Sequence, residues 1–156
     1  MSEPGRAYLF DTDAILALLR PQPSDAYVRW LARIPREDQY TSAVVLAELY
    51  TAAHCQRAED PPASTDPVEE LTSRLLPALT VLPFGADVAV TFGAVAAGTR
   101  DLPNPPLPEA QGTWRHLAVG ATALHYRLVL ITGRPERYTA FPGLDVQSLS
   151  DLNSSS

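Results

Sequence analysis

The sequence predicts a single α/β domain with a parallel sheet of about four or five strands flanked by helices. Short apolar runs alternate along the chain with segments whose apolar residues recur at helical spacing. The run at 128–132 is apolar and rich in branched residues, as expected of a parallel strand covered on both faces. The run at 8–10 ends in Asp11 and leads directly into a helix-forming segment.

The expected elements follow one another without a domain break. The composition of the Pro-rich segments at 57–67 and 101–112 predicts loops. These loops do not mark a domain boundary, because the last strand must return to the same sheet. We expect one domain over 1–147 and a flexible tail over 148–156. The expected strands are 8–10, 39–41, 80–84, 128–132 and 144–146, and the expected helices are 14–19, 25–34, 42–53, 66–76, 85–99 and 113–126.

Composition is that of a folded globular protein, with 46% hydrophobic and 19% charged residues. The net charge of −6 argues against coating nucleic acid by bulk electrostatics, but it leaves room for a local basic face or a metal-mediated phosphate site. A single cysteine, Cys55, excludes an internal disulfide and favours a reducing compartment. With neither a signal-peptide pattern nor an apolar run near the roughly 18 residues of a membrane span, we expect a cytoplasmic protein.

Acidic residues occupy two positions where α/β proteins place chemistry. Asp11 follows the first strand, and ligands of open α/β sheets bind beyond the carboxyl ends of strands. Thr12 or Asp13 is suited to cap the helix that follows. Glu48 lies in the otherwise apolar segment 42–53, so it is either an exposed helix residue or a carboxylate that faces a cleft.

Four segments carry a family resemblance. They read YLFDTDAILALLRPQP at 8–23, TSAVVLAELYTAA at 41–53, VLPF at 81–84, and LAVGATALHYRLVLIT followed by FPGL within 117–144. The chain resembles the PIN domain family, and specifically the VapC-type toxins with their FitB-like branch. The segments lie in family order with family spacing, so the resemblance covers almost the whole chain and implies the PIN fold.

This resemblance also implies an activity and its partners. PIN domains have a cleft of three or four acids that binds Mg²⁺ or Mn²⁺ and hydrolyses RNA phosphodiesters. Such cations prefer oxygen ligands, and an ion among the acids offsets their mutual repulsion and charge on the phosphate. An RNA substrate, a small antitoxin protein and a homodimer are implied as partners.

The resemblance assigns roles to residues of this chain position by position. The first two family acids match Asp11 and Glu48, which would be the metal ligands. Asp13 stands where the family has Asn, Ser or Asp. The third and fourth family acids match His116 and Arg134, so two of the four acidic positions are substituted.

Three interpretations of the substituted cleft remain open. In the first, Asp11, Glu48 and Asp13 hold one ion with His116 as a nitrogen ligand, which favours Mn²⁺ or Zn²⁺. In the second, the nuclease is lost and the domain binds a protein or RNA. In the third, a nearby acid fills the gap, for which the candidates are Asp101, Glu109 and Glu136.

Basic residues raise a further alternative. Positive charge concentrates in the C-terminal part near the expected cleft, where it either contacts phosphate or is solvated, at Arg115, Arg127, Arg134 and Arg137. Thr12, Arg115 and Arg134 are expected to support the acids or contact phosphate. Arg134 could also pair with an acid of the cleft and replace the cation's charge.

The sequence therefore favours a VapC-like, metal-dependent ribonuclease with a degenerate acidic cleft. The alternative is a catalytically inactive PIN domain that serves as a protein- or RNA-binding module. A nucleotide-binding α/β domain is disfavoured, because no Gly-rich loop follows the first strand.

Overall fold

The computed structural model describes residues 5–59, 65–100, 113–139 and 141–154. A five-stranded sheet runs through its centre in the order β3-β2-β1-β4-β5, and every neighbouring pair is parallel. The expected α/β fold with a parallel sheet is confirmed. The strands are β1 (Tyr8–Phe10), β2 (Gln39–Ser42), β3 (Thr80–Leu82), β4 (Val129–Thr132) and β5 (Val146–Ser148).

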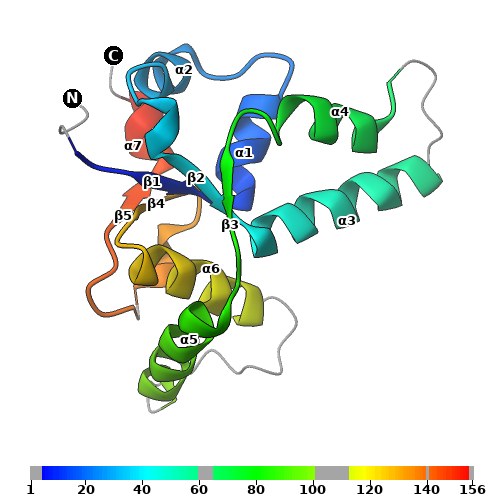
Figure 1. Ribbon diagram of the computed structural model, residues 1–156. Coiled ribbons are helices and arrows are strands. Elements are labelled where there is room, and N and C mark those ends of the chain that lie inside the picture. The colour runs from blue at the N-terminus through cyan, green and yellow to red at the C-terminus, as the bar shows by residue number, and fades with distance from the viewer. Residues whose placement is uncertain (1–4, 60–64, 101–112, 140, 155–156) are drawn as a thin grey trace.

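Helices cover the sheet on both sides. In Figure 1, α5 and α6 lie on one side of the sheet, and α1, α2 and α7 lie on the other. Two short 3₁₀ helices, η1 and η2, complete the connections. The α-helices are α1 (Thr12–Leu19), α2 (Asp25–Leu31), α3 (Ala43–Glu59), α4 (Pro67–Arg74), α5 (Ala86–Thr99), α6 (Thr113–His125) and α7 (Leu149–Ser154), and the 3₁₀ helices are η1 (Arg36–Asp38) and η2 (Pro135–Tyr138).

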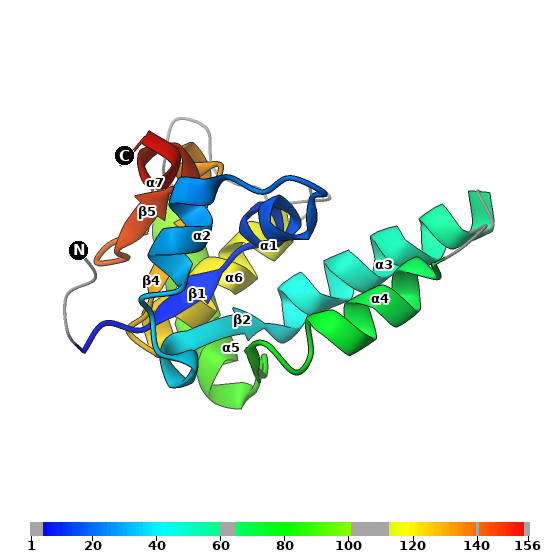
Figure 2. The same cartoon turned by 90° about the horizontal axis from the view of Figure 1, so that it is seen from above.

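Helices α3 and α4 pack along each other and project from the body as an arm, which Figure 2 shows clearly. Asp66 caps α4 by accepting a hydrogen bond from the Val68 amide at 2.9 Å, and Pro67 occupies the first turn, as the sequence indicates. Helix α3 continues to Glu59, past the expected end at residue 53. An ion pair of 3.2 Å between Arg57 and Asp66 joins the far ends of the two helices.

The central strands β1 and β4 lie buried in the core. Every residue of β1 and of β4 is buried, which is the reason for their continuous apolar runs. Trp30 packs beside β1, with its ring edge-to-face against Tyr8 at 5.2 Å between centroids. No helix of the described residues is long and apolar enough to cross a membrane.

The end of the chain differs from expectation. The last strand lies at residues 146–148 instead of 144–146, and α7 occupies most of the segment expected to be a flexible tail. Leu149 and Leu152 are buried and belong to the core, and α7 packs against α2. Burial of these two leucines, three residues apart on one helical face, accounts for a helix in this part of the chain.

Replacing Leu152 with alanine tests this packing. Leu152 is only 3% exposed, so Leu152→Ala is expected to lower the free energy of unfolding by about 2–4 kcal/mol. Urea unfolding followed by circular dichroism measures the change. The control is Asn153→Ala, which replaces the exposed neighbour of Leu152. It should change the free energy of unfolding by less than about 0.5 kcal/mol. Equal effects of the two substitutions would show that α7 does not contribute to the core.

Candidate functional site

A cleft of about 240 Å³ opens at the carboxyl ends of β1 and β4, beside the start of α3. It lies where parallel sheets bind ligands. One wall is acidic and the other is basic. The residues that line it are Asp11, Thr12, Asp13, Leu16, Glu48, His116, Arg134 and Arg137. The fold thus brings seven of the residues singled out from the sequence to one place, although they are spread over 127 positions of the chain, from Asp11 to Arg137.

Asp11 is the most enclosed member of the cleft. Its side chain begins α1, and one carboxylate oxygen accepts a hydrogen bond from the Thr12 amide at 2.8 Å. The other oxygen accepts hydrogen bonds from the hydroxyls of Thr132 and Tyr138, both at 2.9 Å. Burial raises the pKa of Asp11 and the charge of nearby Asp13 adds to this effect, while the three hydrogen bonds act in the opposite direction.

Tyr138 remains a hydrogen-bond donor at every physiological pH. Burial and the neighbouring charge of Asp11 both raise the pKa of the Tyr138 hydroxyl. The sequence did not indicate either Tyr138 or Thr132 as a partner of Asp11. The only available signal was an aromatic residue in an otherwise polar, Pro-containing segment four residues after Arg134.

Glu48 projects from α3 and is held from two sides. The hydroxyl of Thr12 donates to one carboxylate oxygen, and Arg115 of α6 pairs with the other at 3.3 Å. Thr12 therefore connects the two acids, because its amide binds Asp11 and its hydroxyl binds Glu48. Both oxygens of Glu48 have protein donors.

Asp13 has one oxygen bound and one unsatisfied. The Gly133 amide donates to the first at 3.1 Å, and the second is buried with no hydrogen-bond partner among the described residues. A Cβ at position 133 would lie 2.7 Å from the bound oxygen. Glycine at 133 thus permits the close approach of the loop after β4 to the first turn of α1.

The basic wall consists of His116, Arg134 and Arg137. The guanidinium of Arg137 contacts Nε2 of His116, and the ring of His116 lies 5.9 Å from that of Tyr138 between centroids. Arg134 uses its backbone amide to bind the Thr132 hydroxyl at 3.1 Å.

The idea that Arg134 replaces a cation by pairing with an acid is not what the structure shows. Arg134 is exposed, and within the described part of the chain its guanidinium makes no ion pair with Asp11 or Glu48. The arginine that pairs with an acid of the cleft is Arg115, which comes from α6.

The described residues of the cleft do not form an assembled divalent-cation site of three or more ligands. No group of three or more His, Cys, Asp or Glu in this part of the chain is placed to hold a metal ion. The oxygens of Asp11 and Glu48 already accept hydrogen bonds from protein donors, and only one oxygen of Asp13 is left without one. Glu136 does not line the cleft, and Asp101 and Glu109 lie outside the described residues.

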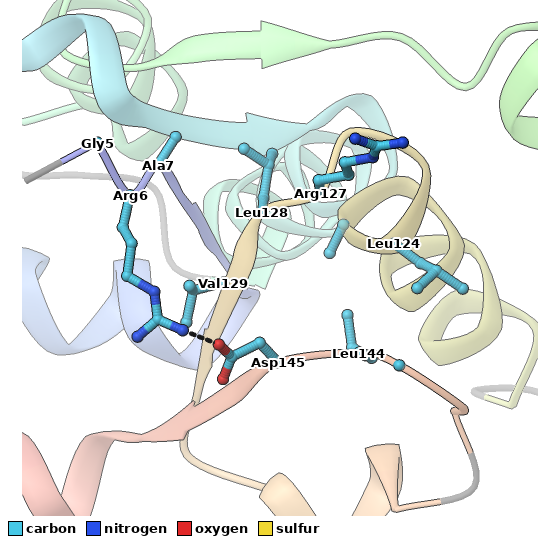
Figure 3. A pocket seen from close by; sticks show the side chains of 11 residues that line it. Gly5, Arg6, Ala7, Leu124, Arg127, Leu128, Val129, Leu144 and Asp145 are labelled. Carbon is cyan, nitrogen blue, oxygen red and sulfur yellow. Dashed lines mark hydrogen bonds and ion pairs between the residues drawn. The ribbon is translucent and has the colours of Figure 1, made fainter. Parts of the chain in front are cut away.

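A second pocket, of about 420 Å³, lies at the opposite ends of β1 and β4. Figure 3 shows Arg6 and Asp145 joined by an ion pair across it, with Leu144 alongside. Arg127 lines this pocket and adopts a positive φ of 55°. The expectation that Arg127 belongs to a basic patch near the cleft is therefore wrong, because the turn between α6 and β4 lies at the other end of the sheet.

Comparisons with known proteins agree on the type of domain. A PIN domain family model matches residues 8–133. Toxin FitB of Neisseria gonorrhoeae is 49% identical over 41 residues. That match covers 26% of this chain and 30% of the toxin's own length.

Solved structures with the same fold cover nearly the whole chain. FitAB bound to an IR36 DNA fragment superposes with a TM-score of 0.72 at 23% identity and covers 90% of this chain and 94% of its own. FitAcB from Neisseria gonorrhoeae superposes with a TM-score of 0.68 at 26% identity, and the match covers 89% of this chain and 95% of that chain. VapBC2 from Rickettsia felis, bound to a DNA fragment from its promoter, superposes with a TM-score of 0.69 at 17% identity. The match covers 91% of this chain and 98% of that chain.

The burial of Asp11 predicts a stability effect that depends on pH. Because the pKa of Asp11 is raised in the folded state, protonation of Asp11 stabilises the fold. This stabilisation is complete below about pH 3.8 and is lost as the pH rises through the raised pKa. At neutral pH the buried charge therefore costs stability. In Asp11→Asn the neutral amide can still form hydrogen bonds with the neighbouring hydroxyls, because these can rotate. The variant is therefore expected to raise Tm, by about 2–4 °C for each kcal/mol of folding free energy that removal of the buried charge restores.

Thermal unfolding across an acid-to-neutral pH series measures this effect. The gain should be largest near neutral pH and should vanish at the acid end, where the wild-type carboxyl is protonated. Glu37→Gln removes an exposed acid away from the cleft and should leave Tm unchanged throughout. A loss of Tm in Asp11→Asn at neutral pH would show that the charged carboxylate stabilises the fold.

Proposed function

This chain belongs to the PIN domain family, and we propose that it is the toxin component of a toxin–antitoxin pair of the FitAB and VapBC kind. The local identity to Toxin FitB and the fold shared with FitAB and VapBC2 support this proposal. An RNA substrate, an antitoxin protein, a homodimeric state and a cytoplasmic location belong to the same proposal.

An apolar groove beside the cleft supports an antitoxin partner. It measures about 180 Å³ and runs between α1 and the α3–α4 arm. Leu16 is 46% exposed and lines both the groove and the cleft. A segment of an antitoxin that lay in the groove would therefore reach the cleft, where it could block access of RNA.

We propose further that the cleft acts on RNA and that its metal-dependent ribonuclease activity is weakened or lost. The observation that supports this is the single cleft in which Asp11 and Glu48 face His116 and Arg134. In a four-acid cleft, Mg²⁺ or Mn²⁺ would activate water and offset phosphate charge. Here any cation that still binds would depend on Asp11, Glu48 and Asp13.

The competing function is a catalytically inactive PIN domain that binds protein or RNA. The hydrogen bonds of the two family acids favour it, because Asp11 has three protein donors and Glu48 has two. A carboxylate that is satisfied in this way gains less from a metal ion than a free one does. Cleavage of RNA by purified protein with Mn²⁺ or Mg²⁺ distinguishes the two functions.

Restoring acids at the two substituted positions tests the degenerate cleft. In the double variant His116→Asp/Arg134→Asp, two carboxylates join Asp11 and Glu48, so Mn²⁺ is expected to bind about tenfold more tightly or better than to the wild type. Isothermal titration calorimetry with Mn²⁺ and Mg²⁺ measures the affinity. Cleavage of a labelled RNA should increase in parallel.

Two controls complete this experiment. Adding Asp11→Asn to the double variant should abolish the gained affinity, and in the wild type it should abolish any residual binding. A folded double variant that binds Mn²⁺ no better than the wild type would contradict the view that the cleft is a substituted metal site. The inactive binding module would then be the better description.

A further inference from the structure

We propose that the basic wall of the cleft binds a phosphate group of RNA through the guanidinium groups of Arg134 and Arg137, without any divalent cation. The identity of the ligand as RNA rests on the proposed function, whereas the affinity for phosphate rests on the geometry of these side chains. In this proposal the two arginines supply positive charge to the cleft directly, without pairing with its acids.

The cleft has as many arginines in or beside it as it has acids. The acids that line it are Asp11, Asp13 and Glu48. Arg134 and Arg137 also line it, and Arg115 pairs with Glu48. A cleft of acids alone repels phosphate unless a cation lies between them. In this cleft the offsetting charge is covalently attached, so a phosphate does not require a metal ion to approach.

Two of the three guanidiniums form no ion pair with a carboxylate of the described residues. Arg115 pairs with Glu48 at 3.3 Å, but neither Arg134 nor Arg137 pairs with a carboxylate within the described part of the chain. The guanidinium of Arg137 contacts an imidazole instead, that of His116. Positive charge that lies in a cleft without a carboxylate partner attracts an external anion, and arginine binds phosphate oxygens through two parallel hydrogen bonds.

The two arginines are held on the same side of one turn. Arg134 precedes η2 and Arg137 lies within it, and the Arg137 amide donates to the Arg134 carbonyl at 3.1 Å. Residues three apart in a 3₁₀ turn are eclipsed, so both side chains project toward the cleft that they line.

Hydrogen bonds at both ends hold this turn in place before any ligand binds. At its end the Tyr138 hydroxyl donates to Asp11 at 2.9 Å, and at its start the Arg134 amide donates to Thr132 at 3.1 Å. Tyr138 itself is only 2% exposed. A turn that is already ordered loses little entropy on binding, which increases affinity.

A polymer of phosphates suits the arrangement better than an acidic peptide. Arg134 and Arg137 lie three residues apart, at the start of η2 and within it, and a nucleic acid offers one phosphate per nucleotide to such contacts. Each of its phosphodiesters carries a single charge, so the nearby acids repel it no more than they repel a carboxylate. Polyglutamate, which carries the same charge per residue without phosphate, is therefore the discriminating competitor.

Fluorescence anisotropy of a labelled single-stranded RNA in EDTA tests the proposal on the full chain. We expect binding in EDTA that is at least about tenfold weaker in Arg134→Gln/Arg137→Gln, with a salt slope lower by about 1.4 for two lost contacts. The matched control Arg29→Gln/Arg33→Gln removes two exposed arginines that do not line the cleft and should bind as the wild type does. Arg134→Lys/Arg137→Lys should keep the salt slope and lose part of the affinity.

Several outcomes would overturn the proposal. No RNA binding in EDTA would do so, as would equal weakening by the control pair or displacement of RNA by polyglutamate at equal charge concentration. Cleavage that requires Mn²⁺ without any binding in EDTA would contradict this proposal but support the ribonuclease. Binding in EDTA without cleavage at any metal concentration would support this proposal and contradict the ribonuclease.

Discussion

The carboxylate of Asp11 is buried at the carboxyl end of the central strand, where Thr12, Thr132 and Tyr138 donate hydrogen bonds to it. These donors come from α1, from β4 and from η2, so one side chain joins three parts of the cleft. Burial makes the charged form costly, as the raised pKa of Asp11 indicates. Each donor offsets some of that cost, and for this reason the surrounding elements are held in one arrangement.

The position of the basic wall follows from this hydrogen-bonded carboxylate. Tyr138 reaches Asp11 from the end of η2, which fixes the turn that carries Arg134 and Arg137. The same turn sets the ring of Tyr138 beside that of His116. A change that released Tyr138 from Asp11 would therefore alter the acidic and the basic walls together, although only the first contains a carboxylate.

Sequence patterns predicted most of the fold, whereas the meeting of the cleft residues was implied by the family resemblance; for two of them it also follows from where parallel strands end. Asp11 follows β1 and Arg134 follows β4, so their proximity follows from the topology. The bonds around them did not follow, since nothing local marks Thr132 and Tyr138 as donors to a residue more than 120 positions away. Helix α7 was missed for a similar reason: only two buried leucines in a polar segment support it.

The two positions that the family resemblance assigns to acids would act in combination. By that correspondence, His116 in place of one acid would remove a ligand, and Arg134 in place of the other would remove a second ligand and add a positive charge. The proposed loss of affinity for a cation and the proposed gain of affinity for an anion would thus come from the same side chains. A domain changed in this way can retain the surface that holds RNA while the chemistry on RNA declines, because positioning a phosphate needs charge and fixed donors, whereas activating water needs a metal or a base.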